Sequence, residues 1–388
     1  MIFPKTRLNL SGDRFTVIYR LTGSDETEAQ TKAEGICLEQ TVEVPLHLLA
    51  NDTIRADVVG RIESFTTLAD NHFEAAISYA LETLGSELTQ LLNVVFGNSS
   101  MQPCIRVERI NFSDALLQQF QGPRFGRAGI RKVLGVNKRP LLCTALKPMG
   151  LSAEALAGLA YQFAFGGIDI IKDDHGLANQ SFAPFQERMQ RCAAAVNEGS
   201  QKSGYRSIYV PNITGPANQI IDRAFEAKQA GAGGVMLAPG LTGLDVLRQL
   251  AEDDSFALPI FSHPAWQGSL VSHPRQGLSH RVVFGQLPRL AGADATIYVN
   301  YGGRFSFSRQ ACRGIVEETG TAMGQLKPIF PTPGGGMTLA KLPEMIEFYG
   351  HDVILLIAGG LYGHGPDLGK SCREFRQFLE QAGTGVVQ

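Results

Sequence analysis

The sequence lacks an excess of charge of either sign. Its 388 residues include 35 Lys and Arg against 37 Asp and Glu, and the formal net charge is −2. Proteins that bind nucleic acid or anionic membranes through their surface usually carry a strongly basic region. The sequence therefore predicts no nucleic acid and no membrane as a partner. With 44% hydrophobic and 19% charged residues, it indicates an ordinary globular protein.

Long hydrophobic runs and paired cysteines are also missing. No apolar stretch approaches the roughly 18 residues of a membrane-spanning helix. Residues 1–5 have neither the basic nor the apolar region of a signal peptide. The six cysteines are scattered without a C-x-x-C pair, which predicts reduced thiols rather than a disulfide framework. We therefore expect a cytoplasmic protein.

The first 125 residues predict a small α+β domain. Its helices are expected at 24–36, behind an N-cap at Ser24, and at 87–95. Its strand-like runs cover 15–21, 39–44, 54–65, 72–79 and 104–111. Strands flanked by two helices in one short segment favour a ferredoxin-like sandwich.

Residues 126–388 predict a second domain in which strands and helices alternate. Apolar runs occur at 140–146, 168–171, 207–210, 234–238, 258–261, 295–299, 326–330 and 353–357. Eight such units within about 245 residues are the count of a (β/α)₈ TIM barrel. A doubly wound open sheet is the alternative, and the even spacing of the units favours the barrel.

Polar residues follow the second of these runs, at the end where barrels keep their active sites. Lys172 and Asp174 point to the same side of a strand, since side chains alternate with period two, and His175 comes next. If carbon dioxide converted Lys172 to a carbamate, the three would predict a Mg²⁺ site rich in oxygen ligands. The alternative is a structural ion pair between Lys172 and Asp174.

Glycine-rich turns follow the last two runs. The candidate residues there are Thr332, Gly334, Gly335, Gly359 and Gly360. Barrels bind phosphate through backbone N–H groups at these two positions, so the pair predicts a phosphate site. Each turn taken alone fits an ordinary tight turn.

Three further residues stand at strand ends. Lys147 follows the first run and is a candidate acid or base, or else a surface lysine. Asn212 follows the third run and is a candidate for substrate binding. His263 follows the fifth run, as a candidate catalytic residue or as a core histidine bonded to backbone.

Taken in order, these motifs resemble the RuBisCO superfamily over nearly the whole chain. The motifs are Gly97-Asn98, Phe120-Gln121-Gly122-Pro123, Leu146-Lys147-Pro148, Gly166-Gly167-Ile168-Asp169, Lys172-Asp173-Asp174, Asn212, His263 and the two glycine turns. The resemblance implies that Lys172 is the carbamylated lysine and Asp174 a Mg²⁺ ligand. It also implies a homodimer in which Glu34 and Asn98 of one subunit complete the active site of the other.

Departures from the family pattern argue against carboxylation of ribulose bisphosphate. His175 stands where carboxylating members have a glutamate ligand, and Met149 replaces the second lysine after Lys147-Pro148. Pro264 replaces a phosphate-binding arginine, and the strand-6 loop has Gly302-Gly303-Arg304 in place of a lysine. The chain therefore resembles the non-carboxylating RuBisCO-like proteins, form IV of the superfamily.

That resemblance implies enolisation of a phosphorylated ketone by an isomerase, enolase or decarboxylase. Expected substrates include 5-methylthioribulose 1-phosphate and 3-oxo-isoapionate 4-phosphate. Lys147 is retained, whereas some methionine-salvage enolases place their base at the position of Asn98, which favours an isomerase or decarboxylase. A catalytically silent barrel that binds a sugar phosphate and a true ribulose-bisphosphate carboxylase are the alternatives.

Overall fold

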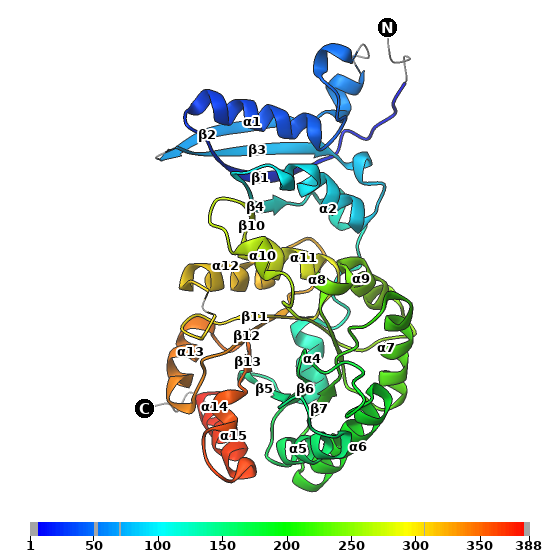
Figure 1. Cartoon of the computed structure of the whole chain (residues 1–388), viewed down its shortest axis with the longest axis vertical. Helices are drawn as coiled ribbons and strands as arrows, with labels where there is room; N and C mark the ends of the chain where they lie inside the picture. The colour runs from blue at the N-terminus through cyan, green and yellow to red at the C-terminus, as the bar shows by residue number, and fades with distance from the viewer. Residues whose placement is uncertain (1–6, 50–52, 70, 306, 384–388) are drawn as a thin grey trace. The chain divides into compact units, whose positions relative to one another are not determined.

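The structure, a computed structural model, describes residues 7–49, 53–69, 71–305 and 307–383. The chain forms two compact units (Figure 1). The first takes residues up to 120 together with 267–287 and 322–326, and the second takes the rest. The division expected at residue 125 does not include these two later segments in the first unit.

The first unit is built on a five-stranded sheet with the order β10-β4-β1-β3-β2. Its principal elements are β1 (Arg14–Thr22), α1 (Glu26–Glu39), β2 (Arg61–Ala69), β3 (His72–Ala80), α2 (Leu88–Phe96), β4 (Ile105–Asn111) and β10 (Gly277–Leu278). Strands β1 to β4 pair antiparallel, and β10 runs parallel to β4. The succession β1-α1-β2-β3-α2-β4 is ferredoxin-like, so the predicted class is confirmed.

Two strands expected in the first unit differ from the structure. The run expected at 54–65 is helical at Ile54–Val58, and β2 begins only at Arg61. Residues 39–44 do not form a strand, because α1 continues to Glu39 and its C-cap is Gln40. The buried amide of Gln40 donates to the carbonyl oxygens of Asn93 and Val94, at 2.7 and 2.9 Å. The helix begins at Asp25, whose carboxylate accepts the N–H of Glu28 at 2.8 Å, rather than at Ser24. The bonds from Gln40 to α2 fix the C-terminal end of α1, and they cannot be seen in the local sequence pattern because their partners are more than 50 residues away.

The second unit contains an eight-stranded parallel sheet closed into a barrel. The strands are β5 (Leu141–Leu146), β6 (Ile170–Asp173), β7 (Ile208–Val210), β8 (Val235–Leu237), β9 (Ile260–Ser262), β11 (Ala295–Val299), β12 (Phe330–Gly334) and β13 (Ile354–Leu356). Their order is β7-β6-β5-β13-β12-β11-β9-β8, and a bridge between Asn212 and Met236 joins the first to the last. The predicted TIM barrel is confirmed.

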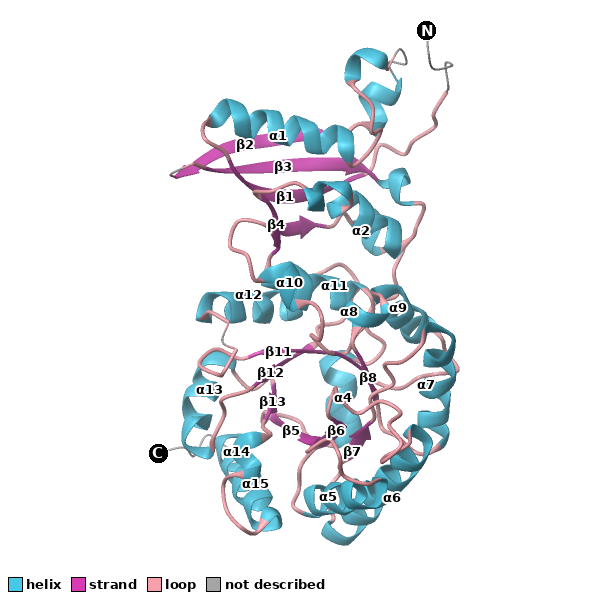
Figure 2. Cartoon of the chain, in the orientation of Figure 1, coloured by secondary structure: helices cyan, strands magenta, loops and turns pink. Residues whose placement is uncertain are grey.

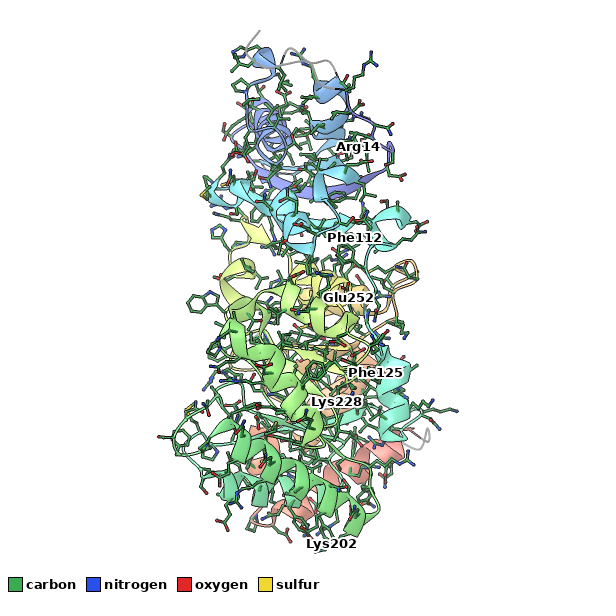
Figure 3. The ribbon with its side chains drawn as sticks, turned by 90° about the vertical axis from the view of Figure 1, so that its right-hand side faces the viewer. Arg14, Phe112, Phe125, Lys202, Lys228 and Glu252 are labelled. Carbon is green, nitrogen blue, oxygen red and sulfur yellow. The ribbon has the colours of Figure 1, made fainter. Side chains whose placement is uncertain are left out.

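Helices enclose the ring of strands, as Figure 2 shows in cyan around magenta. The longer ones are α4 (Gly126–Leu134), α5 (Ala153–Phe165), α6 (Phe185–Ser203), α7 (Ile220–Gln229), α9 (Leu244–Glu252), α12 (Arg309–Gly320), α13 (Leu342–Tyr349) and α15 (Leu368–Gly383). Lys202 and Lys228 are exposed near the C-terminal ends of α6 and α7, where a cation suits the helix dipole (Figure 3).

Short helical elements complete the connections. They are Leu46–Leu48, Ile54–Val58, Leu81–Leu84, Asn98–Met101, α3 (Asp114–Leu117), Ala217–Gln219, α8 (Pro239–Thr242), α10 (Gly268–Val271), Val282–Gln286, α11 (Leu287–Leu290), Leu339–Lys341 and α14 (Gly359–Tyr362). None of the helices in the described ranges is both long enough and apolar enough to cross a bilayer.

The seventh barrel strand lies four residues later than the expected run at 326–330. Strand β12 begins at Phe330, and its Thr332 and Gly334 pair with Ile297 and Val299 of β11. Pro331 and Pro333 stand within the strand, although Pro lacks the N–H of a ladder hydrogen bond and is uncommon there. Thr332 therefore lies inside β12 instead of following it.

Alternation along β6 decides which side chains enter the barrel. Ile170 belongs to the apolar cluster that fills the barrel, together with Leu141, Cys143 and Val210 of the neighbouring strands. Lys172 lies two residues further along β6, so its side chain faces the same interior. Ile171 and Asp173 alternate with these residues and point outward, toward the surrounding helices. The polar side chains at the end of β6 therefore face two sides: Lys172 faces the barrel interior and Asp173 faces the helices.

Candidate active site

Lys172 is buried at the C-terminal end of β6. It pairs with Ala145 of β5 and Val210 of β7, and only 2% of it is exposed. Its Nζ donates to the backbone carbonyl of Asp173 at 2.8 Å. Burial lowers the pKa of Lys172, which increases the share of the neutral amine at a given pH.

Asp174 connects a lysine and a histidine at the mouth of the barrel. Its Oδ1 lies 3.3 Å from Nζ of Lys147 and 3.3 Å from Nδ1 of His175. Burial alone would raise the pKa of Asp174, but the hydrogen bond with His175 and the nearby lysine charges hold it well below its usual range. The lysine that forms an ion pair with Asp174 is thus Lys147, whereas the structural alternative expected Lys172.

His263 faces His175 across the mouth. The two imidazole rings stack with centroids 4.8 Å apart and planes at 16°. His263 follows β9 and is buried, and its Nδ1 accepts the backbone N–H of Ala265 at 3.2 Å. Burial lowers the pKa of His263 well below 6.5, and the charge of Lys172 lowers it further. The ring is therefore neutral, with its proton on Nε2.

A buried network behind β6 supports these residues. The Asp173 carboxylate accepts from Nε of Arg188 at 3.2 Å, the hydroxyl of Tyr209 at 2.7 Å and the backbone N–H of Asn212 at 3.0 Å. Both Asp173 and Arg188 have fully buried side chains. Sequence reasoning missed Arg188 and Tyr209, because they lie on the outward-facing side of the strand end, where only the fold brings them together.

The side chain of Asn212 is fully engaged with backbone. Its Nδ2 donates to the carbonyl oxygens of His175 and Leu177, both at 3.0 Å, and its Oδ1 accepts the N–H of Thr214 at 3.2 Å. These bonds hold the loop that carries His175. The expected contact of Asn212 with the substrate stays a prediction.

The two glycine turns lie against each other at the same end of the barrel. Gly335 and Gly336 have φ angles of 102° and 70°, which favour glycine. A Cβ on Gly360 would come within 2.0 Å of the carbonyl oxygen of Met337, so the second turn packs directly on the first. Thr332 is buried in β12, and Gly334 ends that strand beside Leu356.

The turn after β13 also reaches Lys147. The hydroxyl of Tyr362, at the end of α14, accepts the backbone N–H of Lys147 at 3.1 Å. The glycine turns and the Lys147–Asp174 pair therefore belong to one end of the barrel.

Glu34 and Asn98 lie in the first unit. Glu34 is exposed on α1 and accepts from Nε2 of Gln30 at 3.3 Å. Asn98 is exposed, and its Nδ2 donates to Glu39 at 3.0 Å. Their expected contribution to an active site of a second subunit stays a prediction.

Comparison with known proteins identifies the fold and the motifs as those of one family. Residues 126–385 match the family model of the ribulose bisphosphate carboxylase large chain, catalytic domain. The chain is 36% identical over 363 residues to ribulose bisphosphate carboxylase-like protein 1 of Rhodopseudomonas palustris, covering 94% of this chain and 96% of that protein. It is 38% identical over 351 residues to a 5-methylthioribulose-1-phosphate isomerase of Rhodospirillum rubrum, covering 90% and 91% of the two chains.

Solved structures agree with the sequence relatives. A rubisco-like protein from Alicyclobacillus acidocaldarius superposes with a TM-score of 0.88 at 32% identity, over 97% of this chain and 95% of the other. A 2,3-diketo-5-methylthiopentyl-1-phosphate enolase of Bacillus licheniformis is 32% identical over 359 residues, which are 91% of this chain and 88% of the enolase. The chain therefore belongs to the RuBisCO superfamily, and within it to the non-carboxylating RuBisCO-like proteins.

Proposed function

We propose that this protein is an enzyme that enolises a phosphorylated ketose or keto sugar acid with the help of Mg²⁺, without fixing carbon dioxide. The observation that carries the proposal is the cluster at the barrel mouth, where Asp174 lies 3.3 Å from both Lys147 and His175 beside buried Lys172. Relatives named for 5-methylthioribulose 1-phosphate and 2,3-diketo-5-methylthiopentyl 1-phosphate support this substrate class. A branched substrate such as 3-oxo-isoapionate 4-phosphate has the same reacting group.

The residues present fit Mg²⁺ if Lys172 carries a carbamate. Among the residues that the structure describes, no three His, Cys, Asp or Glu gather as a metal-binding group. Asp174 offers a carboxylate and His175 an imidazole, and a carbamate on Lys172 would add the further oxygen ligand. Mg²⁺ held there would stabilise the negative charge that develops on the substrate oxygens during enolisation.

The chain's own groups move the proton. In an isomerisation, Lys147 Nζ removes the proton from the carbon next to the substrate carbonyl and returns it to the adjacent carbon. In a decarboxylation, loss of CO₂ forms the enolate, and the ammonium of Lys147 donates a proton to the carbon that the carboxylate leaves. The side chain of Lys147 is 43% exposed, so a substrate can reach it, and Asp174 fixes its amine. Neutral His263 can donate from Nε2 to a substrate oxygen, because Nδ1 is occupied by the N–H of Ala265.

The glycine turns would bind the phosphate. Backbone N–H groups near Gly334, Gly335, Gly359 and Gly360, with Thr332 at the base, offer hydrogen bonds without a charged side chain. The contact between Gly360 and Met337 supports this role, since it leaves no room for a Cβ where the two turns meet.

We further propose that the protein works as a homodimer in the cytoplasm. A dimeric archaeal Rubisco from Hyperthermus butylicus is 26% identical to this chain with a TM-score of 0.85, over 98% of this chain and 93% of that one. In such a dimer, Glu34 and Asn98 of one copy would complete the active site of the other. The six cysteines are unpaired, as in proteins of reducing compartments.

Solvent deuterium exchange tests the proposed function. In D₂O with Mg²⁺ and bicarbonate, the wild type is expected to incorporate deuterium into 5-methylthioribulose 1-phosphate. Lys147→Met, which keeps most of the side chain but removes the amine, should abolish incorporation. Lys202→Met is the control, because Lys202 is exposed on α6, where it pairs with Glu198 and lies over the ring of Tyr161, away from the strand ends. Equal exchange by Lys147→Met and wild type would overturn the role of Lys147. Tight phosphate-ester binding without exchange would favour a silent binding protein.

A further inference from the structure

The hydroxyl of Tyr362 occupies a specific place at the end of the barrel sheet. Strand β13 pairs with β5 as far as Leu356 and Cys143, and the N–H of Ile357 still donates to the carbonyl of Cys143 at 2.9 Å. Beyond Ile357 the chain turns away from β5 into α14. The last residues of β5 therefore lose their neighbour on that side just before Lys147.

Tyr362 replaces the missing strand at this point. Its hydroxyl oxygen accepts the backbone N–H of Lys147 at 3.1 Å. The same hydroxyl lies 3.1 Å from the carbonyl oxygen of Ala145 and 3.3 Å from that of Lys147, and its single proton is donated to one of these oxygens or shared between them. One phenol thus fixes the N–H of Lys147 and bonds to the carbonyl groups on either side of it in the chain.

The ring of Tyr362 is itself held in place. It packs edge-on against Phe163 of α5, with centroids 5.5 Å apart and planes at 87°, and Phe163 is fully buried. Burial raises the pKa of Tyr362 to about 12, so the hydroxyl keeps its proton at neutral pH and remains a donor. Because α5 follows β5 in the chain, the contact ties Tyr362 to the same strand–helix unit that carries Lys147.

We propose that Tyr362 is a positioning residue that sets the direction of the Lys147 side chain. The backbone of Lys147 is fixed by Tyr362, and the amine is fixed by Asp174 at 3.3 Å. With both ends held, the amine meets the substrate carbon in one orientation. Tyr362 acts through Lys147 and touches no reacting atom. The inference rests on the proposed role of Lys147 as the group that moves the proton.

The variant Tyr362→Phe removes the hydroxyl and keeps the ring against Phe163. Misplacing a reacting group by about 1 Å can cost about a hundredfold in rate, so we expect kcat for deuterium exchange to fall at least about tenfold. KM should change less than about threefold, because substrate binding does not use Tyr362, and proton transfer should show a larger isotope effect with α-deuterated substrate. The matched control is Tyr79→Phe in the first unit, which removes a buried hydroxyl bonded to Tyr19 at 2.9 Å.

Hydrogen exchange of the Lys147 amide tests the contact without any substrate. In protein labelled with ¹⁵N-lysine, the loss of one hydrogen bond should speed exchange of the Lys147 N–H by about fivefold in Tyr362→Phe. The amide of Lys172, inside β6, should not change. Unchanged exchange at Lys147 would show that Tyr362 does not fix it. Faster exchange at Lys147 with unchanged kcat would refute the catalytic consequence.

These readouts separate this inference from the proposed function. If the wild type exchanges no proton on any phosphorylated ketose, the proposed function fails, and with it the catalytic part of the inference. The amide exchange then still decides whether Tyr362 positions Lys147. If the wild type is active and Tyr362→Phe matches it in kcat, only the inference about Tyr362 fails.

Discussion

Replacing Asp173 by Asn should destabilise the barrel strongly. The carboxylate of Asp173 lies 3.2 Å from Nε of Arg188, and neither side chain is exposed to solvent. It also accepts from the hydroxyl of Tyr209 and the backbone N–H of Asn212, at 2.7 and 3.0 Å. The neutral amide would leave the guanidinium of Arg188 buried without its counter-charge and would turn an NH₂ group toward these donors.

The magnitude follows from the burial of the pair. Removing one member of a buried ion pair costs about 3–5 kcal/mol, out of a total stability of roughly 5–15 kcal/mol. The matched control is Asp352→Asn. Asp352 pairs with Arg131 at 2.8 Å, but its side chain is 56% exposed, and an exposed pair is worth about 1 kcal/mol or less.

Urea unfolding followed by far-UV circular dichroism measures both variants. We expect the midpoint of Asp173→Asn to fall well below those of wild type and Asp352→Asn. The double variant Asp173→Leu/Arg188→Met should recover much of the loss, since it removes both buried charges together. A loss of about 1 kcal/mol or less in Asp173→Asn would refute the reasoning, because it would mean that water or another group already compensates Arg188.

Two other predictions follow from the same end of the barrel. The depressed pKa of His263 means that the unfolded chain takes up a proton below about pH 6.5 that the folded chain does not, so stability is lost as pH falls through that range. His263→Gln should reduce this slope by about 1.4 kcal/mol per pH unit, measured by urea unfolding at pH 7.5, 6.5 and 5.5, and an unchanged slope would contradict it. Gly360→Ala should destabilise the protein by about 1–3 kcal/mol and abolish phosphate-ester binding in calorimetry, because the new Cβ meets the carbonyl of Met337. Gly158→Ala on α5 is its control, since nothing lies within 4 Å of a Cβ there, and equal effects of the two would refute the packing argument.

The barrel could be predicted from the sequence because each strand–helix unit is formed by residues that are close together in the chain. Apolar runs separated by helical stripes mark each strand–helix unit, and the alternation along β6 correctly put Lys172 on the same side as Ile170. The prolines in β12 hid that strand, since Pro is normally read as a strand breaker. The two-residue strand β10 has no pattern long enough to detect.

Contacts between distant residues could not be predicted. Spacing suggested Lys172 as the ionic partner of Asp174, whereas the structure pairs it with Lys147, which comes from another strand. Tyr362 follows a glycine turn and belongs to no recognisable motif. Its hydroxyl meets Lys147 only in the fold, because the two residues are 215 positions apart in the chain. The hydrogen bonds of the Asn212 side chain to the backbone of His175, Leu177 and Thr214 likewise could not be predicted from its place after the third strand.

We propose that a carbamate on Lys172 prepares the site for its metal. ¹³C NMR of the protein with ¹³C-bicarbonate and Mg²⁺ tests it most directly. We predict a carbamate resonance in the wild type and in Lys147→Met, stronger with Mg²⁺ than without it, and absent in Lys172→Met. A spectrum of Lys172→Met that retains the resonance of the wild type, or a wild type that shows none, would contradict the account.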